Sequence, residues 1–319
     1  MSPNSGTVLV GAGIVLLVLT LTASAAMAPD LEAGAGATDR TLVGGQGITN
    51  QGEVRMLNGS EPVFRITGAN SYFEVEALGE GRFAVAFAEE HASACGPYEP
   101  PCARTGFRVI DPLPEPKIVS EWSFPVRTAE NSELHAVEPL ADGTFAVADM
   151  DRERIAVVND GTIEWQWNAS AFYEAPPDPT TTDWLHINDV DAIGGGRLLV
   201  SVRNANQLLV LERGRGVVEV INADRGEGDE ATCRRPGELV DRDGDGDVRC
   251  GDPALFTHQH NPHWLGNGAV LIADSENDRV VELHRTARGR WTPVWQLSSA
   301  GGVDFYWPRD ADRLPNGHT

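Results

Sequence analysis

Histidine side chains recur at one position of a repeated segment, where they could act as bases, nucleophiles or anion-binding donors. The segments that begin at His135 and His260 both place a leucine five residues on and a glycine eight residues on. A third segment begins at His186 and has Asn188 in the same column, with Ile193 five residues further on. Repeated β units of a propeller bring equivalent positions to one axis. The spacing therefore predicts that imidazole and amide groups converge there.

The same column extends towards both ends of the chain. It holds Phe73 in a fainter copy and Arg309 in the last one, while His258 lies two residues before its own column position. Guanidinium and imidazole donors suit a small anion, and a neutral imidazole beside that anion could act as nucleophile or base. We expect His258 to be a loop or supporting group and Arg309 to be a lesser candidate. For each histidine taken alone, the alternative is a structural cap of its strand.

Short apolar strands separated by turns must position these side chains. Each polar residue of the column is followed by a strand, a loop rich in Asp, Asn and Arg, a second strand, and a third strand with a tryptophan. The two clearest copies run over residues 143–149, 151–158 and 161–167, and over residues 268–274, 277–283 and 291–295. Such repetition predicts an all-β protein, a β-propeller. The alternative is that similar hairpins recur by chance, as they do in other all-β folds.

The charge balance excludes one class of partner. Among 319 residues there are 47 acidic and 25 basic side chains, the net charge is −22, and Lys117 is the only lysine. A surface this acidic does not neutralise phosphates, so we expect no nucleic-acid partner. A hydrophobic content of 41% opposes disorder. An acidic, lysine-poor surface fits a very salty environment, where screening weakens self-repulsion.

The N-terminus divides the chain into three parts. Residues 7–28 are an apolar run without charges, so we interpret residues 1–28 as a signal peptide or a membrane anchor. Residues 29–41 are rich in Gly and Ala and predict a flexible linker, and residues 42–319 form the propeller domain. Either interpretation of the apolar run predicts an extracellular or cell-surface protein, secreted or membrane-anchored.

The cysteines agree with an exported chain. Cys95 and Cys102 bracket one short loop, and Cys233 and Cys250 bracket an acidic one. An even count in an exported protein favours two local disulfides over a zinc site, which would need a closely spaced cysteine pair.

The acidic loop has the spacing of a calcium-binding loop. Oxygen ligands at positions 1, 3, 5 and 12 and a glycine at position 6 are typical of EF-hand-type loops, and hard oxygen donors suit Ca²⁺. The acidic residues are Asp241, Asp243, Asp245, Asp247 and Asp252. We therefore expect a structural calcium ion, with an ordinary solvated acidic loop as the alternative.

Four stretches resemble the arylsulfotransferase family, specifically its propeller-type arylsulfate sulfotransferases, which do not use 3′-phosphoadenosine-5′-phosphosulfate, and their halophilic archaeal relatives. The resemblance covers most of residues 41–319. The stretches that carry it are residues 183–188, 201–204, 259–261 and 314–317. The resemblance implies a six-bladed propeller. Because the chain is shorter than the bacterial members, we expect its last blade to be incomplete.

The resemblance also implies a reaction: transfer of a sulfuryl group from a phenolic sulfate ester to a phenol through a sulfohistidine, without an organic cofactor. The nucleophile corresponds to His260, the histidine of an earlier blade to His135, and the anion-binding arginine to Arg203. The family's His-x-Asn pair corresponds to His186 and Asn188. By analogy with phosphoryl transfer, the arginine and this pair hold the sulfuryl oxygens, and His135 exchanges a proton with the phenol.

Two other classes of function compete with this one. A catalytically silent extracellular propeller would bind a small ligand or a partner protein, and would not need all five of these side chains. Another propeller enzyme, such as a quinoprotein or a lactonase, is the third possibility. Lactonases need carboxylate or amide metal ligands in the channel, whereas we expect the carboxylates here to cluster only in the loop insertion.

Overall fold

The computed structural model describes the greater part of the chain. The described residues are 40–46, 52–129, 132–173, 175–223, 250–314 and 316–319. Within these ranges the chain is all-β, and its only helices are four single turns of 3₁₀ helix. These are η1 (Ala169–Ala171), η2 (Pro179–Thr181), η3 (Arg203–Ala205) and η4 (Ser275–Asn277).

Five antiparallel sheets follow one another along the chain. The first contains β1 (Arg40–Gly45), β2 (Glu53–Asn58) and β3 (Glu61–Thr67). The second contains β4 (Ser71–Gly79), β5 (Arg82–Ala92), β6 (Cys102–Asp111) and β7 (Lys117–Val126). The third contains β8 (Leu134–Pro139), β9 (Phe145–Asp149), β10 (Arg154–Asn159) and β11 (Thr162–Asn168).

The last two full sheets have the same build. The fourth contains β12 (Ile187–Gly194), β13 (Arg197–Val202), β14 (Gln207–Glu212) and β15 (Gly216–Ile221). The fifth contains β16 (His260–Gly266), β17 (Ala269–Asp274), β18 (Arg279–Arg285) and β19 (Trp291–Leu297). A small hairpin, β20 (Ser299–Ala300) and β21 (Val303–Asp304), follows.

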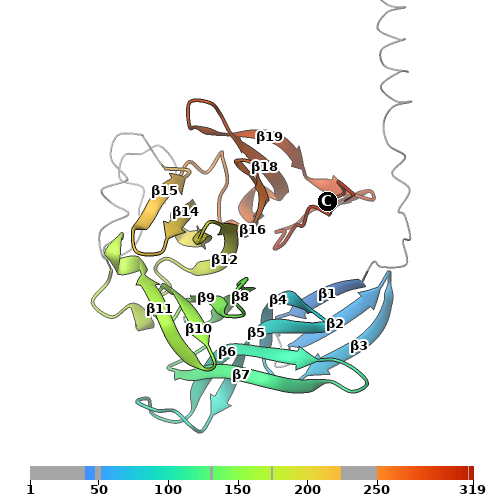
Figure 1. Ribbon diagram of the computed structural model, residues 1–319, viewed down its shortest axis with the longest axis vertical. Coiled ribbons are helices and arrows are strands. Elements are labelled where there is room, and N and C mark those ends of the chain that lie inside the picture. Colours follow the sequence, from blue (N-terminus) through green and yellow to red (C-terminus); the bar gives the residue numbers. More distant parts are fainter. Residues whose placement is uncertain (1–39, 47–51, 130–131, 174, 224–249, 315) are drawn as a thin grey trace, which may run out of the picture.

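The sheets are arranged as a five-bladed propeller (Figure 1). Strands β1, β4, β8, β12 and β16 are innermost, and residues of all five line one central cavity. The predicted all-β propeller is confirmed. The sequence repeat did not predict the blade β1–β3, because its strands lack the column residues followed by apolar residues and glycine that mark the other copies.

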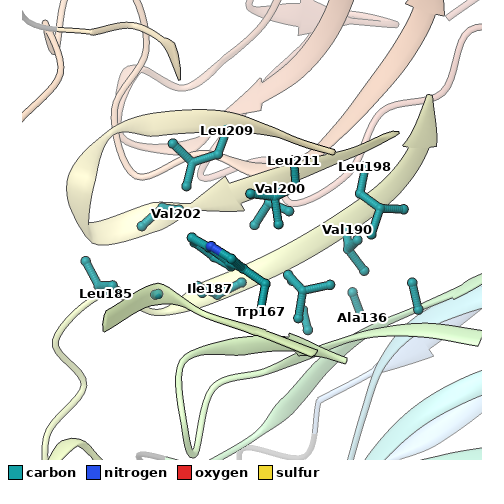
Figure 2. Packing of buried hydrophobic residues seen from close by; sticks show 14 of the residues in the cluster. Ala136, Trp167, Leu185, Ile187, Val190, Leu198, Val200, Val202, Leu209 and Leu211 are labelled. Carbon is teal, nitrogen blue, oxygen red and sulfur yellow. The ribbon is translucent and has the colours of Figure 1, made fainter. Parts of the chain in front are cut away.

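Apolar faces packed between neighbouring sheets hold the blades together. Figure 2 shows the cluster between the third and fourth sheets, where Trp167, Ile187, Val200 and Leu209 lie close to one another. Strands β13 and β14 of this cluster are rich in Val and Leu, which suit a pleated surface buried on both faces. Burial of each large side chain contributes about 1.5–3 kcal/mol.

One hydrogen bond between adjacent innermost strands occurs three times. In each case a carboxylate of one innermost strand accepts the backbone N–H of the next innermost strand. The pairs are Val137 N to Glu74 Oε2 (2.9 Å), Ala192 N to Glu138 Oε1 (3.1 Å) and Trp264 N to Asp191 Oδ2 (2.8 Å). We call these bonds the inter-blade staples. They pair backbone groups that the inner edge of each sheet would otherwise leave without a partner.

Several sequence expectations concern the chain outside the blades. The Cys95–Cys102 disulfide is present. Cys233, the other four loop aspartates and residues 1–39 lie outside the described residues. Asp252 is described: it is exposed, and its Oδ1 accepts the N–H of Ala254 at 2.9 Å. In the part of the chain from Arg40 onward that the structure describes, no helix has the length and apolarity to cross a membrane.

Candidate active site

A left-handed corner precedes three of the column residues. His186, His258 and Trp307 have φ values of 53°, 52° and 49°, and each lies two residues before its column position. Left-handed backbone is costly for a residue with a side chain, so it persists only where the surroundings fix it. The three column residues that follow these corners are Asn188, His260 and Arg309.

The preceding blade fixes each corner by accepting its backbone N–H. The acceptor side chain always belongs to a residue that is itself left-handed, with φ between 45° and 51°. The three bonds are His186 N to Glu153 Oε1 (2.6 Å), His258 N to Asn206 Oδ1 (3.0 Å) and Trp307 N to Asp278 Oδ1 (2.8 Å). The segment that carries Arg309 therefore takes the same position as the segments that carry Asn188 and His260.

His260 is held in one tautomer. Its Nδ1 lies 3.1 Å from the carbonyl oxygen of His258 and 2.8 Å from Ser275 Oγ. Ser275 donates its own proton to the carbonyl of Pro308 at 2.7 Å, so it can only accept from the ring. This network assigns the proton to Nδ1. The lone pair then lies on Nε2, which is 2.8 Å from Nη1 of Arg309.

His186 has the same electronic arrangement. Its Nδ1 lies 2.7 Å and 2.8 Å from the two carboxylate oxygens of Asp183, which can only accept. Its Nε2 faces Arg203 Nη1 at 2.7 Å and His135 Nε2 at 3.0 Å. Arg203 also donates from Nη2 to Asp183 at 3.0 Å, which closes a ring of contacts. Two imidazoles in different blades thus each present an Nε2 lone pair to a guanidinium.

Both imidazoles are neutral at ordinary pH. Burial lowers the pKa of His186 well below its usual value, and the neighbouring His135 and Arg203 lower it further. Burial likewise lowers the pKa of His260 well below its usual value, with Arg309 as the next cause. A neutral imidazole keeps the lone pair that a nucleophile needs.

His135 contacts His186 and lines the same cavity as His260. Its ring is buried, lies 4.8 Å from the Phe73 ring, and its Nε2 is 2.9 Å from Oε2 of Glu133. It also lines the cavity into which His260 and Arg309 face. The structure therefore brings together four of the five predicted site residues: His135, His186, Arg203 and His260.

Asn188 does not face the cavity in the way its column position predicts. Its Nδ2 donates to the carbonyl oxygen of Gln259 at 2.8 Å, which ties the fourth blade to the fifth. Its Oδ1 is buried and has no hydrogen-bond partner among the described residues.

The central cavity has a volume of about 910 Å³, and carboxyl groups line it beyond the imidazoles. They are Glu74, Glu76, Glu138, Asp189, Asp191, Asp310 and Asp312. Burial, with repulsion from neighbouring carboxylates, raises the pKa of Glu76 to about 8, that of Glu138 to about 7 and that of Asp310 to about 6. The expectation that carboxylates cluster only in the loop insertion is therefore wrong.

Sequence reasoning underrated or missed several site residues. Arg309, a lesser candidate from the sequence, contacts His260 directly, and the His258 ring lies 5.6 Å from the His260 ring. Glu133, Asp183 and Ser275 were missed. Glu133 could have been found from its place two residues before His135, equivalent to the places of His186 and His258.

Known proteins establish the fold of this chain and no more. No protein-family model and no curated protein matches the sequence. The crystal structure of a protein of unknown function from Bacteroides caccae matches with a TM-score of 0.55 and 14% identity, over 87% of this chain and 80% of that one. A protein from Lactobacillus plantarum matches with a TM-score of 0.50 and 12% identity, over 88% of this chain and 73% of that one. The similarity at this level of identity is one of fold: the chain shares its all-β architecture with these two proteins.

Proposed function

We propose that this protein is an arylsulfotransferase, which moves a sulfuryl group from a phenolic sulfate ester to a phenol through a sulfohistidine on His260. One observation carries the proposal: the neutral imidazole of His260 presents its Nε2 lone pair to the cavity 2.8 Å from the guanidinium of Arg309. A nucleophile beside a fixed cation suits an anionic electrophile.

In the first half of the reaction, the sulfate ester binds between Arg309 and Arg203. Nε2 of His260 attacks sulfur while the bond from sulfur to the aryl oxygen breaks. Charge spreads over the sulfuryl oxygens, which guanidinium donors stabilise, as in phosphoryl transfer. The imidazolium form of His135, paired with Glu133, gives its Nε2 proton to the departing phenolate and becomes neutral, and the sulfuryl group remains on His260.

In the second half, a phenol takes the place of the first product. His135 accepts the phenolic proton, the phenolate oxygen attacks sulfur, and the bond from sulfur to Nε2 of His260 breaks. Both imidazoles return to their starting state. Donor and acceptor use one site in turn, so the mechanism predicts ping-pong kinetics.

The carboxyl-lined part of the cavity does not forbid an anionic substrate. The raised pKa values of Glu76 and Glu138, about 8 and about 7, keep much of their population protonated at neutral pH. The sulfate ester binds in this proposal at the end of the cavity that Arg309 lines, where the charge of Arg203 also acts on His260.

The test is transfer from 4-nitrophenyl sulfate to phenol by the purified full chain in high salt. We expect phenol-dependent release of nitrophenol, and a sulfuryl adduct on the His260 peptide when the acceptor is omitted. His260→Ala removes both signals. The matched control is His284→Ala, which removes an exposed imidazole paired with Glu282 on β18. Folded protein that releases no nitrophenol from several aryl sulfates would favour the silent binding propeller instead.

We also infer a six-unit ring and a position outside the cytoplasm. The segment of Arg309 repeats the corner contact of the other innermost strands, which supports a sixth unit at that place.

The Cys95–Cys102 disulfide supports an oxidising compartment. Protease treatment of intact cells tests the second inference, since an external propeller is digested without lysis.

A further inference from the structure

We infer that Glu133, His135 and His186 form a binding site for a transition-metal dication, for which Zn²⁺ is the best match. Their three ligand atoms lie within 4.8 Å of one another. Nε2 of His135 is 3.0 Å from Nε2 of His186 and 2.9 Å from Oε2 of Glu133. Two imidazole nitrogens and one carboxylate oxygen are a ligand set that zinc accepts.

Two of the three separations between ligand atoms are close to those of a zinc site, and all three atoms lie within 4.8 Å of one another. Bonds of about 2.0–2.1 Å in a tetrahedral zinc site put neighbouring ligand atoms about 3.3 Å apart. The two short separations in this cluster differ from that value by a few tenths of an ångström. A shift of that size lies within the reach of χ rotations in Glu133, whose side chain is 22% exposed.

The surroundings already orient one ligand for a metal. Nδ1 of His186 donates to the carboxylate of Asp183 at 2.7 Å, so the lone pair lies on Nε2, which faces Nε2 of His135 at 3.0 Å. A carboxylate behind a metal-bound imidazole fixes its tautomer and raises its basicity. Three protein ligands leave one position of a tetrahedral ion for water or for an anion in the cavity that His135 lines.

Arg203 competes with the metal for the same lone pair. Its Nη1 lies 2.7 Å from Nε2 of His186, so a zinc ion at Nε2 has to displace this guanidinium. The negative charges of Glu133 and Asp183 offset part of the repulsion between the two cations. We therefore expect zinc to bind where Arg203 now contacts His186, and to inhibit any reaction that needs Arg203 there.

The metal site does not depend on the proposed function. Zinc binding is measured without an aryl sulfate, and sulfuryl transfer is measured in the presence of a chelator. Either result can fail while the other holds.

The experiment titrates the metal-free full chain with Zn²⁺ by calorimetry and counts bound zinc after dialysis. We expect one zinc ion per chain. Glu133→Gln keeps the shape of the side chain but removes the ligand charge, and should weaken binding by about 10- to 100-fold. His186→Ala should abolish it. His284→Ala, which breaks an exposed imidazole–carboxylate pair of 2.6 Å, should leave it unchanged.

Arg203→Met gives the sharper test, because it removes the competing cation and leaves all three ligands. We expect it to tighten zinc binding by about tenfold. Co²⁺ in place of zinc should give the intense visible absorption of a tetrahedral ion, and Glu133→Gln should lose it. The inference is wrong if zinc does not bind stoichiometrically, or if Glu133→Gln and Arg203→Met bind it as the unaltered chain does. Circular dichroism of each variant shows that lost binding does not reflect lost folding.

Discussion

The two imidazoles of the site share one chemical state although they reach it through different partners. A carboxylate accepts the Nδ1 proton of His186, whereas Ser275 and a backbone carbonyl accept that of His260. In both cases Nε2 is left as an acceptor next to a guanidinium. The partner on Nδ1 therefore selects the tautomer, and the arginine on Nε2 marks where an anion can bind.

The low pKa of His260 predicts the acid limb of the rate profile. Only the neutral ring attacks sulfur, so activity is lost as the pH falls through the pKa of His260, which burial and Arg309 place well below 6.5. Sulfuryl transfer should therefore stay near its maximum at pH 6. Arg309→Met removes the neighbouring charge and should move the acid limb to higher pH. The pH dependence of kcat/KM for 4-nitrophenyl sulfate measures both. The prediction is contradicted if, as the pH is lowered, the kcat/KM of the unaltered chain has already fallen to half its maximum above pH 6.5.

Ser275 is a positioning residue, since it touches His260 and not the substrate. Ser275→Ala should slow transfer about tenfold, equivalent to about 1.4 kcal/mol for one lost hydrogen bond. Ser275→Thr keeps the hydroxyl and should recover most of the rate. Single-turnover kinetics measure the effect. A merely structural role predicts instead that both variants lose stability and keep their rate per folded molecule.

Sequence could identify the imidazoles but not their partners. Repetition with constant spacing reveals His135 and His260 because equivalent positions of a propeller meet at one axis, and it draws attention to His186 two residues before Asn188 of the same column. Asp183 belongs to no repeated pattern, and Ser275 opens η4 where Arg203 opens η3 but differs from it in residue type. Only the folded chain shows that Asp183 and Ser275 contact His186 and His260. Asn188 shows the opposite failure: it has the predicted place, but its amide bonds to the neighbouring blade.

At the scale of elements, the left-handed corners are what hold the site in place. Each corner is fixed by a side chain of the preceding blade, so the position of His186 or His258 depends on two sheets rather than one. Sequence reasoning predicted the strands but not these corners, because Glu153 has no intrinsic preference for left-handed backbone. Asn206 and Asp278 do have some preference, and a search for that residue type between the second and third strands would have found them.

Glu153 should therefore be the most sensitive of these residues. Its two oxygens accept the N–H groups of Leu185, His186 and Ile187 at 3.1, 2.6 and 2.9 Å. Glu153→Ala leaves these buried donors without their acceptor, and should lower the free energy of unfolding by about 3 kcal/mol or more. Urea denaturation measures the loss. The control, Glu212→Ala, breaks an exposed pair with Arg215 and should change stability by less than about 1 kcal/mol. Equal losses for the two variants would contradict the role given to Glu153.

At the scale of the whole molecule, carboxyl groups of different blades interact electrostatically across the central cavity. Carboxyl groups from three full blades and from the segment of Arg309 face one space, and their mutual repulsion adds to the cost of burial. Sequence shows the acidic excess of the chain but not its concentration along the axis. That concentration appears only once the innermost strands are placed side by side.

This arrangement predicts an unusual dependence of stability on pH. The pKa values of Glu76 and Glu138, about 8 and about 7, exceed the value of about 4.3 for glutamate in an unfolded chain. Folded protein therefore binds more protons between those limits. The contribution of these groups to stability is fully present below about pH 4 and is lost as the pH rises through 7 and 8.

Thermal unfolding at pH 5, 6.5 and 8 tests this dependence of stability on pH. The midpoint temperature of unfolding should fall as the pH rises. The double variant Glu76→Gln, Glu138→Gln should make this fall per pH unit smaller. A double variant with the slope of the unaltered chain would show that other groups set it.

The inter-blade staples have one more consequence, which concerns how such a ring changes over evolutionary time. Each staple and each corner uses a side chain of one blade and only the backbone N–H of the next. Backbone N–H groups are the same for every residue except proline. Most column residues of the innermost strands are therefore not needed to join blades and can be exchanged without loosening the ring; Asn188, whose amide donates to the carbonyl oxygen of Gln259, is an exception. A scaffold of this kind can acquire a new specificity one side chain at a time.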